Sequence, residues 1–595
     1  MSLVAIIESV SSLAQLLQLG VRPAAVGTWS TAVADACRAA GLPALLEDDV
    51  LSDATREAIQ AHADALVAAL AGREVPRSEA YEDWAWWALE SPLMYVASQG
   101  ARTRHLFDAL RLLAPDATQL VHDFEGSTQG AVLNITADEA GLEVAAFAPA
   151  DHQADAVSRR HDYPVFPGPV EEPIVGYRGV PLPKGGGPYV VVQHTNEIAH
   201  LIVPLSRAGA GRFAIVKDAH LRWPATYNGL AADAEPTGER APFVTPVWPD
   251  RVPAEPWERE VMEHLFITWQ ASMRQLYHWT LAAYRAGPVS MLLTGSDYLP
   301  DIRVRLLVCE RLGIPLVAVQ HGAFLAAHGG RHGHPNHRHA HHNLLYGRAA
   351  AVELAGIGAR GRAWTIGWPQ VICAEARQAL RGARTGARPT DGRWLLLPTG
   401  TGAQFDARCR WTGADRFLRD AIAAWRERGD GAPLAVKCHP FADNVGEIRE
   451  FCVAAGAPDV IIETGLDPWA AVDRAALVIA NNSTSALVPL TLGVPTVVHA
   501  TSSRAWYRRF PDVLVSTTRD ELLAALDALP ARAPAATPRT YARSDTNPAR
   551  RAAAAIRAIL RGARRPRAAV PRPTPAAATA RRVRQPARSG SRYIR

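Results

Sequence analysis

The chain has 595 residues, of which 48% are hydrophobic and 21% are charged. This is the composition of a soluble protein, and the length exceeds what one hydrophobic core can organise, so we expect about three compact units. The formal net charge is +6, but residues 564–595 contain ten arginines and no lysine or acidic residue, so the rest of the chain has a net charge of −4. The high pI of about 9.1 therefore reflects the tail and does not indicate that the folded part binds nucleic acid.

Cysteine usage and hydropathy predict a cytoplasmic protein. The six cysteines are scattered without Cys-x-x-Cys spacing, which is typical of reduced thiols and predicts no zinc site. The apolar N-terminus lacks a basic segment and contains Glu8, so we interpret it as a strand and a helix, not a signal peptide. Since no run of about 18 apolar residues occurs, no membrane span is expected. The arginines of the tail would favour the inner face of an anionic membrane.

Residues 1–165 alternate strand-like and helix-like patterns and predict a first, Rossmann-like α/β unit. Its expected strands and helices are Leu3–Ile7, Ser12–Leu19, Ala24–Gly27, Arg104–Leu113 and Gln119–Val121. An acidic corner with Asp123 and Glu125 follows the last of these strands. The Pro- and Gly-rich stretch 161–188 then indicates a linker.

Residues 187–370 predict a second Rossmann-like unit. It opens with a strand at Tyr189–Gln193 and contains a long helix at Val261–Ala286. It continues with a strand, an acidic corner, a helix and a second strand between Met291 and Gly322. A loop with seven histidines follows (His328, His332, His334, His337, His339, His341, His342). Imidazole is a common metal ligand, but no cysteine or carboxylate stands at the spacing of a structural site, so we expect an acceptor loop and no metal.

Residues 390–530 predict a third Rossmann-like unit, with strands and helices at Trp394–Leu397, Ala414–Arg428, Leu434–Val436 and Val460–Ile462. Residues 531–595 form an Ala-, Pro- and Arg-rich tail that we expect to be mostly disordered, apart from a helix at about Pro548–Arg561. The fold class is therefore α/β, with parallel sheets.

The stretch Leu477–Val498 is the most informative part of the third unit. An apolar strand, Leu477–Ala480, runs into the polar corner Asn481–Ser485, and a helix at Ala486–Leu492 ends at Gly493. The first N–H groups of a helix lack intrahelical partners and lie at its positive end, so this corner can bind a phosphate. The alternative is that Ser483 or Thr484 only caps the helix.

Three motifs stand at the ends of predicted strands: Gln320-His321-Gly322, Lys437-Cys438-His439-Pro440 and Asn482-Ser483-Thr484-Ser485. Parallel α/β proteins bind ligands at the carboxyl ends of their strands. In order and spacing, the set resembles GT-B-type bacterial surface and capsular polysaccharide glycosyltransferases, namely Kdo transferases, sialyltransferases and CDP-glycerol transferases. The resemblance covers roughly residues 187–530 and implies a GT-B-like pair of Rossmann-type domains, with an additional N-terminal unit that it leaves unexplained.

The resemblance also implies roles. Lys437, His439, Pro440, Asn482, Ser483, Thr484 and Ser485 would bind the nucleotide and its phosphates, and His321 would lie on the acceptor side of the cleft. We also expect Glu463 to contact the nucleotide. The implied substrate is a CMP-, CDP- or UDP-linked sugar, with no tightly bound cofactor, and the acceptor would be a surface glycan or a lipid-linked precursor. Cys438 stands where the family commonly has proline, and this leaves the choice of nucleotide open.

Transfer from such a donor needs a base that takes the proton of the acceptor hydroxyl. His321 has the right intrinsic pKa, and Asp297, Asp301, Asp123 or Glu125 are the alternatives. Asp297 and Asp301 could equally cap the helix that follows them, and His439 could bond only to main chain. Two other functions remain open: a nucleotide-sugar epimerase that uses Glu463 and Asp467, and a non-catalytic protein that binds a glycan or nucleotide.

Overall fold

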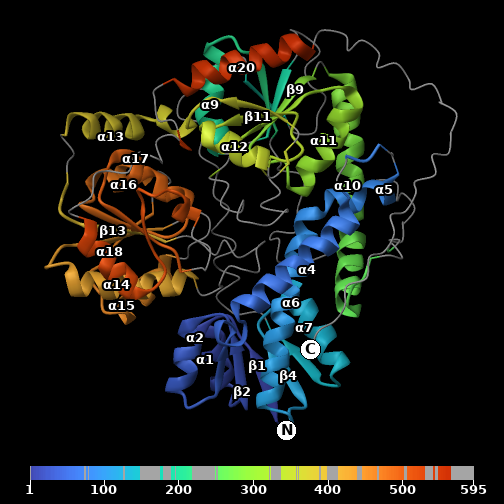
Figure 1. Cartoon of the computed structure of the whole chain (residues 1–595). Coiled ribbons are helices and arrows are strands. Elements are labelled where there is room, and N and C mark those ends of the chain that lie inside the picture. Colours follow the sequence, from blue (N-terminus) through green and yellow to red (C-terminus); the bar gives the residue numbers. More distant parts are fainter. Residues whose placement is uncertain are drawn as a thin grey trace, which may run out of the picture.

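The chain folds into three α/β units, each built on a parallel sheet (Figure 1). This computed structural model describes every residue except 1, 73–74, 78–79, 125–127, 148–173, 178–188, 194–195, 217–247, 249–251, 288, 321, 323–336, 357, 360, 387–389, 399–412, 439–444, 465–467, 502–505, 530–540, 543–546 and 564–595. The α/β class and the pair of Rossmann-type domains with an extra N-terminal unit are confirmed.

The first unit has a five-stranded sheet in the order β3-β2-β1-β4-β5, with every neighbouring pair parallel. Its strands are β1 (Leu3–Ile6), β2 (Ala25–Thr28), β3 (Ala44–Leu46), β4 (Gln119–His122) and β5 (Glu143–Ala146). Its helices are α1 (Val10–Gln18), α2 (Thr31–Ala39), α3 (Glu47–Val50), α4 (Asp53–Ala71), α5 (Tyr81–Ala88), α6 (Glu90–Leu113) and α7 (Thr128–Glu139).

The second unit has a seven-stranded sheet in the order β12-β11-β10-β9-β7-β8-β6. Its strands are β6 (Ile174–Tyr177), β7 (Tyr189–Gln193), β8 (Arg212–Val216), β9 (Val289–Thr294), β10 (Leu316–Val319), β11 (His342–Leu345) and β12 (Arg362–Thr365). Its helices are α9 (Asn196–Arg207), α10 (Pro256–Ala286), α11 (Pro300–Leu312) and α12 (Arg348–Gly356), and η1 (Pro369–Ile372) and α13 (Ala374–Thr385) lead to the third unit.

The third unit has a six-stranded sheet in the order β15-β14-β13-β16-β17-β18. Its strands are β13 (Trp394–Leu397), β14 (Leu434–Lys437), β15 (Ile461–Glu463), β16 (Leu477–Ala480), β17 (Thr496–His499) and β18 (Leu514–Ser516). Its helices are α14 (Gly413–Arg428), α15 (Val445–Ala454), α16 (Pro468–Arg474), η3 (Thr484–Ala486), α17 (Leu487–Leu492), η4 (Trp506–Arg509) and α18 (Arg519–Ala528).

After the third unit the chain returns to the second. Helix α20 (Pro548–Ala563) lies beside α9 on the far side of the molecule from α14 and α15 (Figure 1). Its residues Ala552, Ala553 and Ile556 are buried in one core with Val190 of β7 and Ile198 of α9. The helix expected at about Pro548–Arg561 therefore forms, and it belongs to the core of the second unit; residues 564–595 lie outside the described residues.

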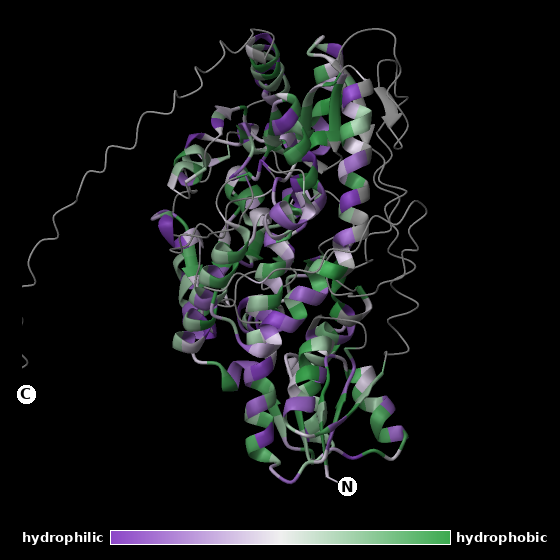
Figure 2. Ribbon diagram, turned by 90° about the vertical axis from the view of Figure 1, so that its right-hand side faces the viewer, coloured by the Kyte–Doolittle hydropathy of each residue, from purple (hydrophilic) through white to green (hydrophobic). Residues whose placement is uncertain are grey.

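The central strands form the apolar interior of each unit, and the helices carry mixed faces (Figure 2). Strands β13 and β16 read as continuous apolar runs, and β14 does so up to Lys437 at its end, because helices cover both faces of a parallel sheet. Helix α10 begins at Pro256, where the Glu258 carboxylate accepts the N–H of Glu255 at 2.9 Å. No helix among the described residues is both long enough and apolar enough to span a membrane.

Two sequence expectations need correction. The linker predicted at 161–188 includes β6, whose four residues pair with β8 at the edge of the second sheet. The helix expected at Ala486–Leu492 is divided into the 3-10 turn η3 and the short helix α17. Helices α4 and α5 were not predicted. Helix α5 is apolar and buried over most of its length and so shows no amphipathic stripe, whereas the buried stripe of α4 includes the polar residues Arg56 and Gln60 beside its apolar ones.

The first and second units share one core. Tyr81 and Trp84 of α5 pack on Phe266 and Tyr277 of α10, and the Tyr81 hydroxyl donates to the Phe266 carbonyl at 3.1 Å. Beside them lies a buried ion pair: Glu90, at the start of α6, is 2.5 Å from Arg303 of α11. The Glu90 carboxylate also contacts Arg338 at 3.2 Å. The helices α4–α6 therefore join the two units into one body.

Burial by itself would raise the pKa of Glu90, but the charge of Arg303 opposes it, and with His339 and Arg338 it holds that pKa well below its usual range. The folded state thus favours the charged carboxylate. Its contribution to stability is fully present above the unfolded-state pKa of about 4.3 and is lost as the pH falls toward the lower folded-state value.

We therefore expect Glu90→Gln to lower the unfolding free energy at pH 7 by about 3 kcal/mol, because Arg303 loses its buried partner. Between pH 6 and pH 3 the wild-type protein should lose stability more steeply than the variant, as urea titrations at several pH values will measure. The matched control is Glu139→Gln, which removes a half-exposed partner of Arg104 and should cost about 0–1 kcal/mol. Equal pH slopes for wild type and Glu90→Gln would contradict this assignment.

Candidate functional site

The carboxyl ends of β10, β14 and β16 carry the predicted site residues. Gln320 and Gly322 follow β10, Lys437 ends β14, and Asn481–Ser485 follows β16. Gly322 of the second unit lies against Thr484 of the third, since a Cβ atom added to Gly322 would be 3.0 Å from Thr484 Oγ1. Loops from two separate parallel sheets therefore meet at one place.

Some predicted site residues cannot be placed. His321, His439 and Pro440 lie outside the described residues, as do the alternatives Glu125 and Asp467. Their roles stay predictions.

Gln320, which is fully buried, holds the loop that follows β10. Its side-chain oxygen accepts the N–H of Tyr346 at 2.7 Å, and its amide nitrogen donates to the Gly322 carbonyl at 2.8 Å. The Gly322 N–H in turn donates to the Tyr346 hydroxyl at 3.2 Å. Gly322 has φ +77°, in the left-handed region that favours glycine. This network fixes the direction in which the chain leaves β10.

The serine turn after β16 is also organised by hydrogen bonds. Ser483, which is 7% exposed, accepts the N–H of Ser485 on its Oγ at 3.1 Å, and the two hydroxyls are bonded to each other. The Ser483 side chain is thus a cap of the 3-10 turn, as one of the two sequence interpretations expected. Thr484 and Ser485 are half-buried, and Thr484 lies beside Gly322.

Two aromatic residues from η4 support this turn. The Tyr507 hydroxyl donates to the Ser483 carbonyl at 2.6 Å, and the main-chain N–H of Trp506 donates to the Asn482 side-chain oxygen at 3.1 Å. Burial raises the pKa of the Tyr507 phenol, so it stays protonated and can donate this bond. The Asn482 amide is therefore used to fix the turn.

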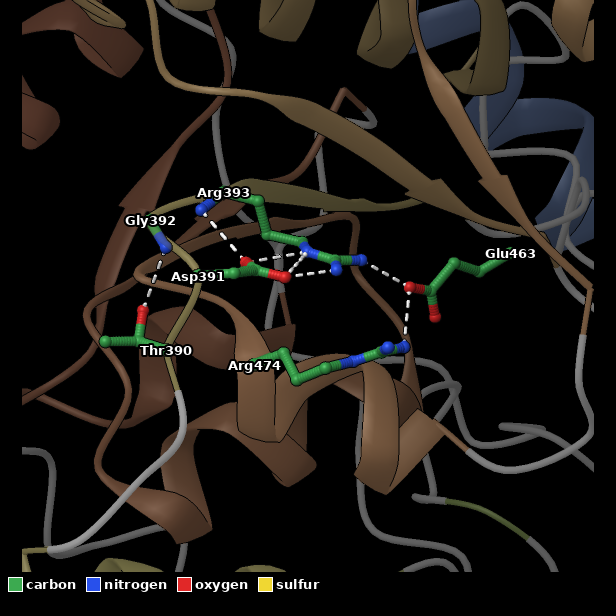
Figure 3. A network of polar contacts seen from close by, with 6 residues as sticks. All are labelled: Thr390, Asp391, Gly392, Arg393, Glu463 and Arg474. Carbon is green, nitrogen blue, oxygen red and sulfur yellow. Dashed lines mark hydrogen bonds and ion pairs between the residues drawn. The ribbon is translucent and has the colours of Figure 1, made fainter.

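Lys437 is 6% exposed, and its Nζ donates to the Cys438 carbonyl at 2.8 Å. On the next strand, the Glu463 carboxylate lies between two arginines: Arg393 Nη1 is 2.5 Å away and Arg474 Nη2 is 2.9 Å away (Figure 3). Arg393 also bonds Asp391. Glu463 is thus engaged in an ion network of the third unit, whereas the sequence predicted a contact with the nucleotide.

The two aspartates considered as bases have structural partners. Asp297 is fully buried, and its carboxylate accepts the main-chain N–H groups of His337, His339 and Ala340, the last two at 2.7 and 2.8 Å. It therefore anchors the end of the histidine-rich loop. Asp301 lies in the first turn of α11 and pairs with Arg305 at 2.8 Å. The described histidines of this loop form no cluster of potential metal ligands with other described residues.

Asp123, the third described alternative, lies in the first unit. Its carboxylate accepts the Glu8 N–H at 3.0 Å, and burial raises its pKa. It thus covers the N-terminus of α1.

A row of aromatic side chains connects the second and third units, and the sequence did not single it out as a cluster. Tyr346 stacks on Trp368 with ring centroids 5.8 Å apart, and Trp368 packs on Trp469 of α16 at 5.2 Å. Tyr346 and Trp368 each stand beside a glycine, in Leu345-Tyr346-Gly347 and Gly367-Trp368-Pro369. These two aromatic residues beside glycines were the signal that could have predicted the contact.

No protein-family model matches the chain, and a search of curated proteins finds no match. Solved structures show a distant likeness. The UDP-GlcNAc 2-epimerase from Neisseria meningitidis is 9% identical, with a TM-score of 0.38, over 63% of this chain and 99% of that protein. MurG from Acinetobacter baumannii is 11% identical, with a TM-score of 0.35, over 63% and 100%. The wall teichoic acid polymerase TagF is 11% identical, with a TM-score of 0.34, over 63% and 89%. At this level the likenesses establish neither ligand nor activity.

The contact between the two loops can be tested at Gly322. Gly322→Ala adds a methyl group 3.0 Å from Thr484 Oγ1 and also places a side chain at a positive φ, which costs about 1–2 kcal/mol. Gly358→Ala is the matched control, because Gly358 has φ +76° and no atom within 4 Å of the added Cβ. Thermal unfolding should show a larger loss for Gly322→Ala. Equal losses would mean that the loops do not press on each other.

Proposed function

We propose that this chain is a GT-B-type glycosyltransferase that moves a sugar, or a polyol phosphate, from a nucleotide-activated donor to a surface-polysaccharide acceptor. The observation that supports the proposal most directly is the approach of Gly322 to Thr484, where the carboxyl ends of two parallel sheets meet. A donor that is bound by one unit and attacked by an acceptor held by the other requires such a junction.

In this proposal the third unit binds the donor phosphates. Cleavage of a sugar–phosphate bond builds negative charge on the leaving phosphate, and donors fixed in advance stabilise that charge most in the transition state. Thr484 and Ser485 would contribute hydroxyls, the turn would contribute main-chain N–H groups, and Lys437 and His439 would contribute charge. The turn is well prepared for this role because Tyr507 and Trp506 already hold it in place.

The acceptor side would be the second unit, with His321 as the base. Asp297 is less suited to this role, since three main-chain N–H groups already use its carboxylate. Glu463 is likewise held by Arg393 and Arg474. Of the two acidic residues that an epimerase would use, Glu463 and Asp467, Glu463 is therefore already engaged. Transfer therefore remains the function that the geometry supports best, with a CMP-, CDP- or UDP-linked donor.

The phosphate site is tested with the double variant Ser483→Ala, Ser485→Ala. Thermal shift with a panel of UDP-, CDP- and CMP-linked sugars should identify a stabilising donor for the wild-type protein, and the variant should show a reduced shift. Loss of the cap will cost about 1 kcal/mol of stability. Ser52→Ala, which removes the cap of α4 in the first unit, is the control: it should cost a similar amount and leave the donor shift intact. Unchanged donor binding in the double variant would leave the turn as a cap only.

The base is tested by kinetics. His321 must be neutral to accept a proton, so transfer should decline as the pH falls below its pKa in the complex. His321→Ala should abolish transfer and retain donor affinity, whereas His439→Ala should weaken donor binding first. Asp297→Asn should mainly lower stability, and Asp301→Asn is the competing base variant. If His321→Ala keeps most of its kcat and Asp301→Asn loses it, the base is the carboxylate. Donor turnover without transfer, in contrast, would indicate an epimerase or a hydrolase.

The arginine-rich tail is proposed to contact anionic membrane. Each arginine near the headgroups contributes roughly 1 kcal/mol. Removal of residues 564–595 should therefore abolish pelleting with phosphatidylserine vesicles while leaving the melting temperature and transfer to a soluble acceptor unchanged. Vesicles of neutral lipid are the control. Equal pelleting of the full-length and truncated chains would refute the proposal.

A further inference from the structure

We propose that the first unit is a latch that is joined permanently to the second unit and docks reversibly on the third, so that it limits how far the second and third units can turn apart about the buried core that joins them at Tyr346, Trp368 and Trp469. This inference goes beyond the proposed function, because it concerns the position of the units and holds for any ligand bound between them.

The permanent side of the latch is hydrophobic and deeply buried. Trp84 and Trp87 of α5 lie in one core with α10 and α11 of the second unit. Arg303 of α11 donates to the Trp87 carbonyl at 2.8 Å, and its guanidinium lies 4.8 Å from the centre of the Trp87 ring. Separation of these surfaces would expose large apolar side chains and a buried charge, so the first and second units move as one body.

The reversible side is polar and lies between α2 of the first unit and α14 of the third. Thr31 Oγ1 donates to the Asp415 carboxylate at 3.0 Å, and Arg419 Nη2 is 2.8 Å from the Asp35 carboxylate. Each contact joins residues 384 positions apart, so the two helices run side by side in a fixed register. The Arg419 and Asp35 side chains are 49% and 43% exposed. Among the described residues, no hydrophobic cluster joins residues of the first unit to residues of the third.

The docking contact uses a position where α/β units usually bind a ligand. The N-terminus of α2 follows β2, at the carboxyl edge of the first sheet. There the Asp415 carboxylate accepts both the hydroxyl and the main-chain N–H of Thr31, as a bound anion would. At the neighbouring helix α1, Asp123 accepts the main-chain N–H of Glu8. Carboxylates of the protein thus occupy both helix starts, which favours docking over ligand binding as the task of this edge.

Helix α14 can transmit the position of the latch to the sheet of the third unit. Phe417 and Ile422 are buried in the core of that unit. One residue beyond the docking arginine, the Asp420 carboxylate is 3.1 Å from Nε2 of the fully buried His499, which ends β17. Because α14 is fixed to its own sheet in this way, opening of the third unit would carry Asp415 and Arg419 away from α2.

The test removes the two side-chain donors of the docking contacts, the Thr31 hydroxyl and the Arg419 guanidinium, in the full-length protein. The variant is Thr31→Val, Arg419→Gln. Its control is Arg428→Gln, which removes an arginine of the same helix whose partners, Glu427 and Asp527, belong to the third unit. Hydrogen exchange in the first turns of α2 and α14 should accelerate roughly tenfold in the variant only, and small-angle scattering should show a larger radius of gyration. Exchange in α5 and α10 should not change. An unchanged radius together with unchanged exchange would overturn the latch.

A charge exchange separates docking from a general loss of stability. Arg419→Asp alone places a carboxylate beside Asp35 and should open the latch by both measures. Adding Asp35→Arg should restore the wild-type radius and exchange rates, because the pair is re-formed with reversed charges. If the double variant behaves like Arg419→Asp alone, the two residues do not hold the units together and the proposal fails.

Discussion

The structure depends on one geometric constraint: in a parallel sheet every loop that follows a strand leaves from the same edge. The second and third units turn those edges toward each other, and they touch where Gly322 lies against Thr484. A Cβ atom at Gly322 would lie 3.0 Å from the hydroxyl oxygen of Thr484, which is a tight contact, and the positive φ of this residue would add backbone strain. The close approach of the two units therefore relies on a residue without a side chain.

The hydrogen bonds around this contact are made by main-chain groups and neutral side chains more than by carboxylates. Gln320 and Tyr346 hold one loop, and Tyr507 and Trp506 hold the other. The acidic residues nearby are already engaged, Asp297 with main-chain N–H groups and Glu463 with two arginines. In the proposed function, a site of this kind would present donors to an anion with its shape fixed before a ligand arrives, which is what stabilisation of developing negative charge requires.

The first unit has a fold that commonly binds ligands, but its contacts favour a docking role. Its sheet has the strand order of a ligand-binding Rossmann-like unit, yet Asp123 and Asp415 cover the starts of α1 and α2. The same unit is joined to the second through a buried aromatic core and to the third through polar contacts at the surface. The difference in the free energy needed to separate these two interfaces gives the molecule one stable joint and one weak joint.

The sequence by itself determined the class of fold and most strands of the second and third units. Apolar runs such as Trp394–Leu397 and Leu477–Ala480 are read correctly because a strand covered on both faces must be apolar throughout. It also placed the glycine, lysine and serine motifs at strand ends, a matter of local order along the chain. Only the tertiary structure decided which partners these residues have. Asp297 meets main chain some 40 residues away, α20 returns to the second unit, and Thr31 meets Asp415 across 384 residues. Such contacts depend on how whole units pack, and periodicity and local propensity carry no information about that packing.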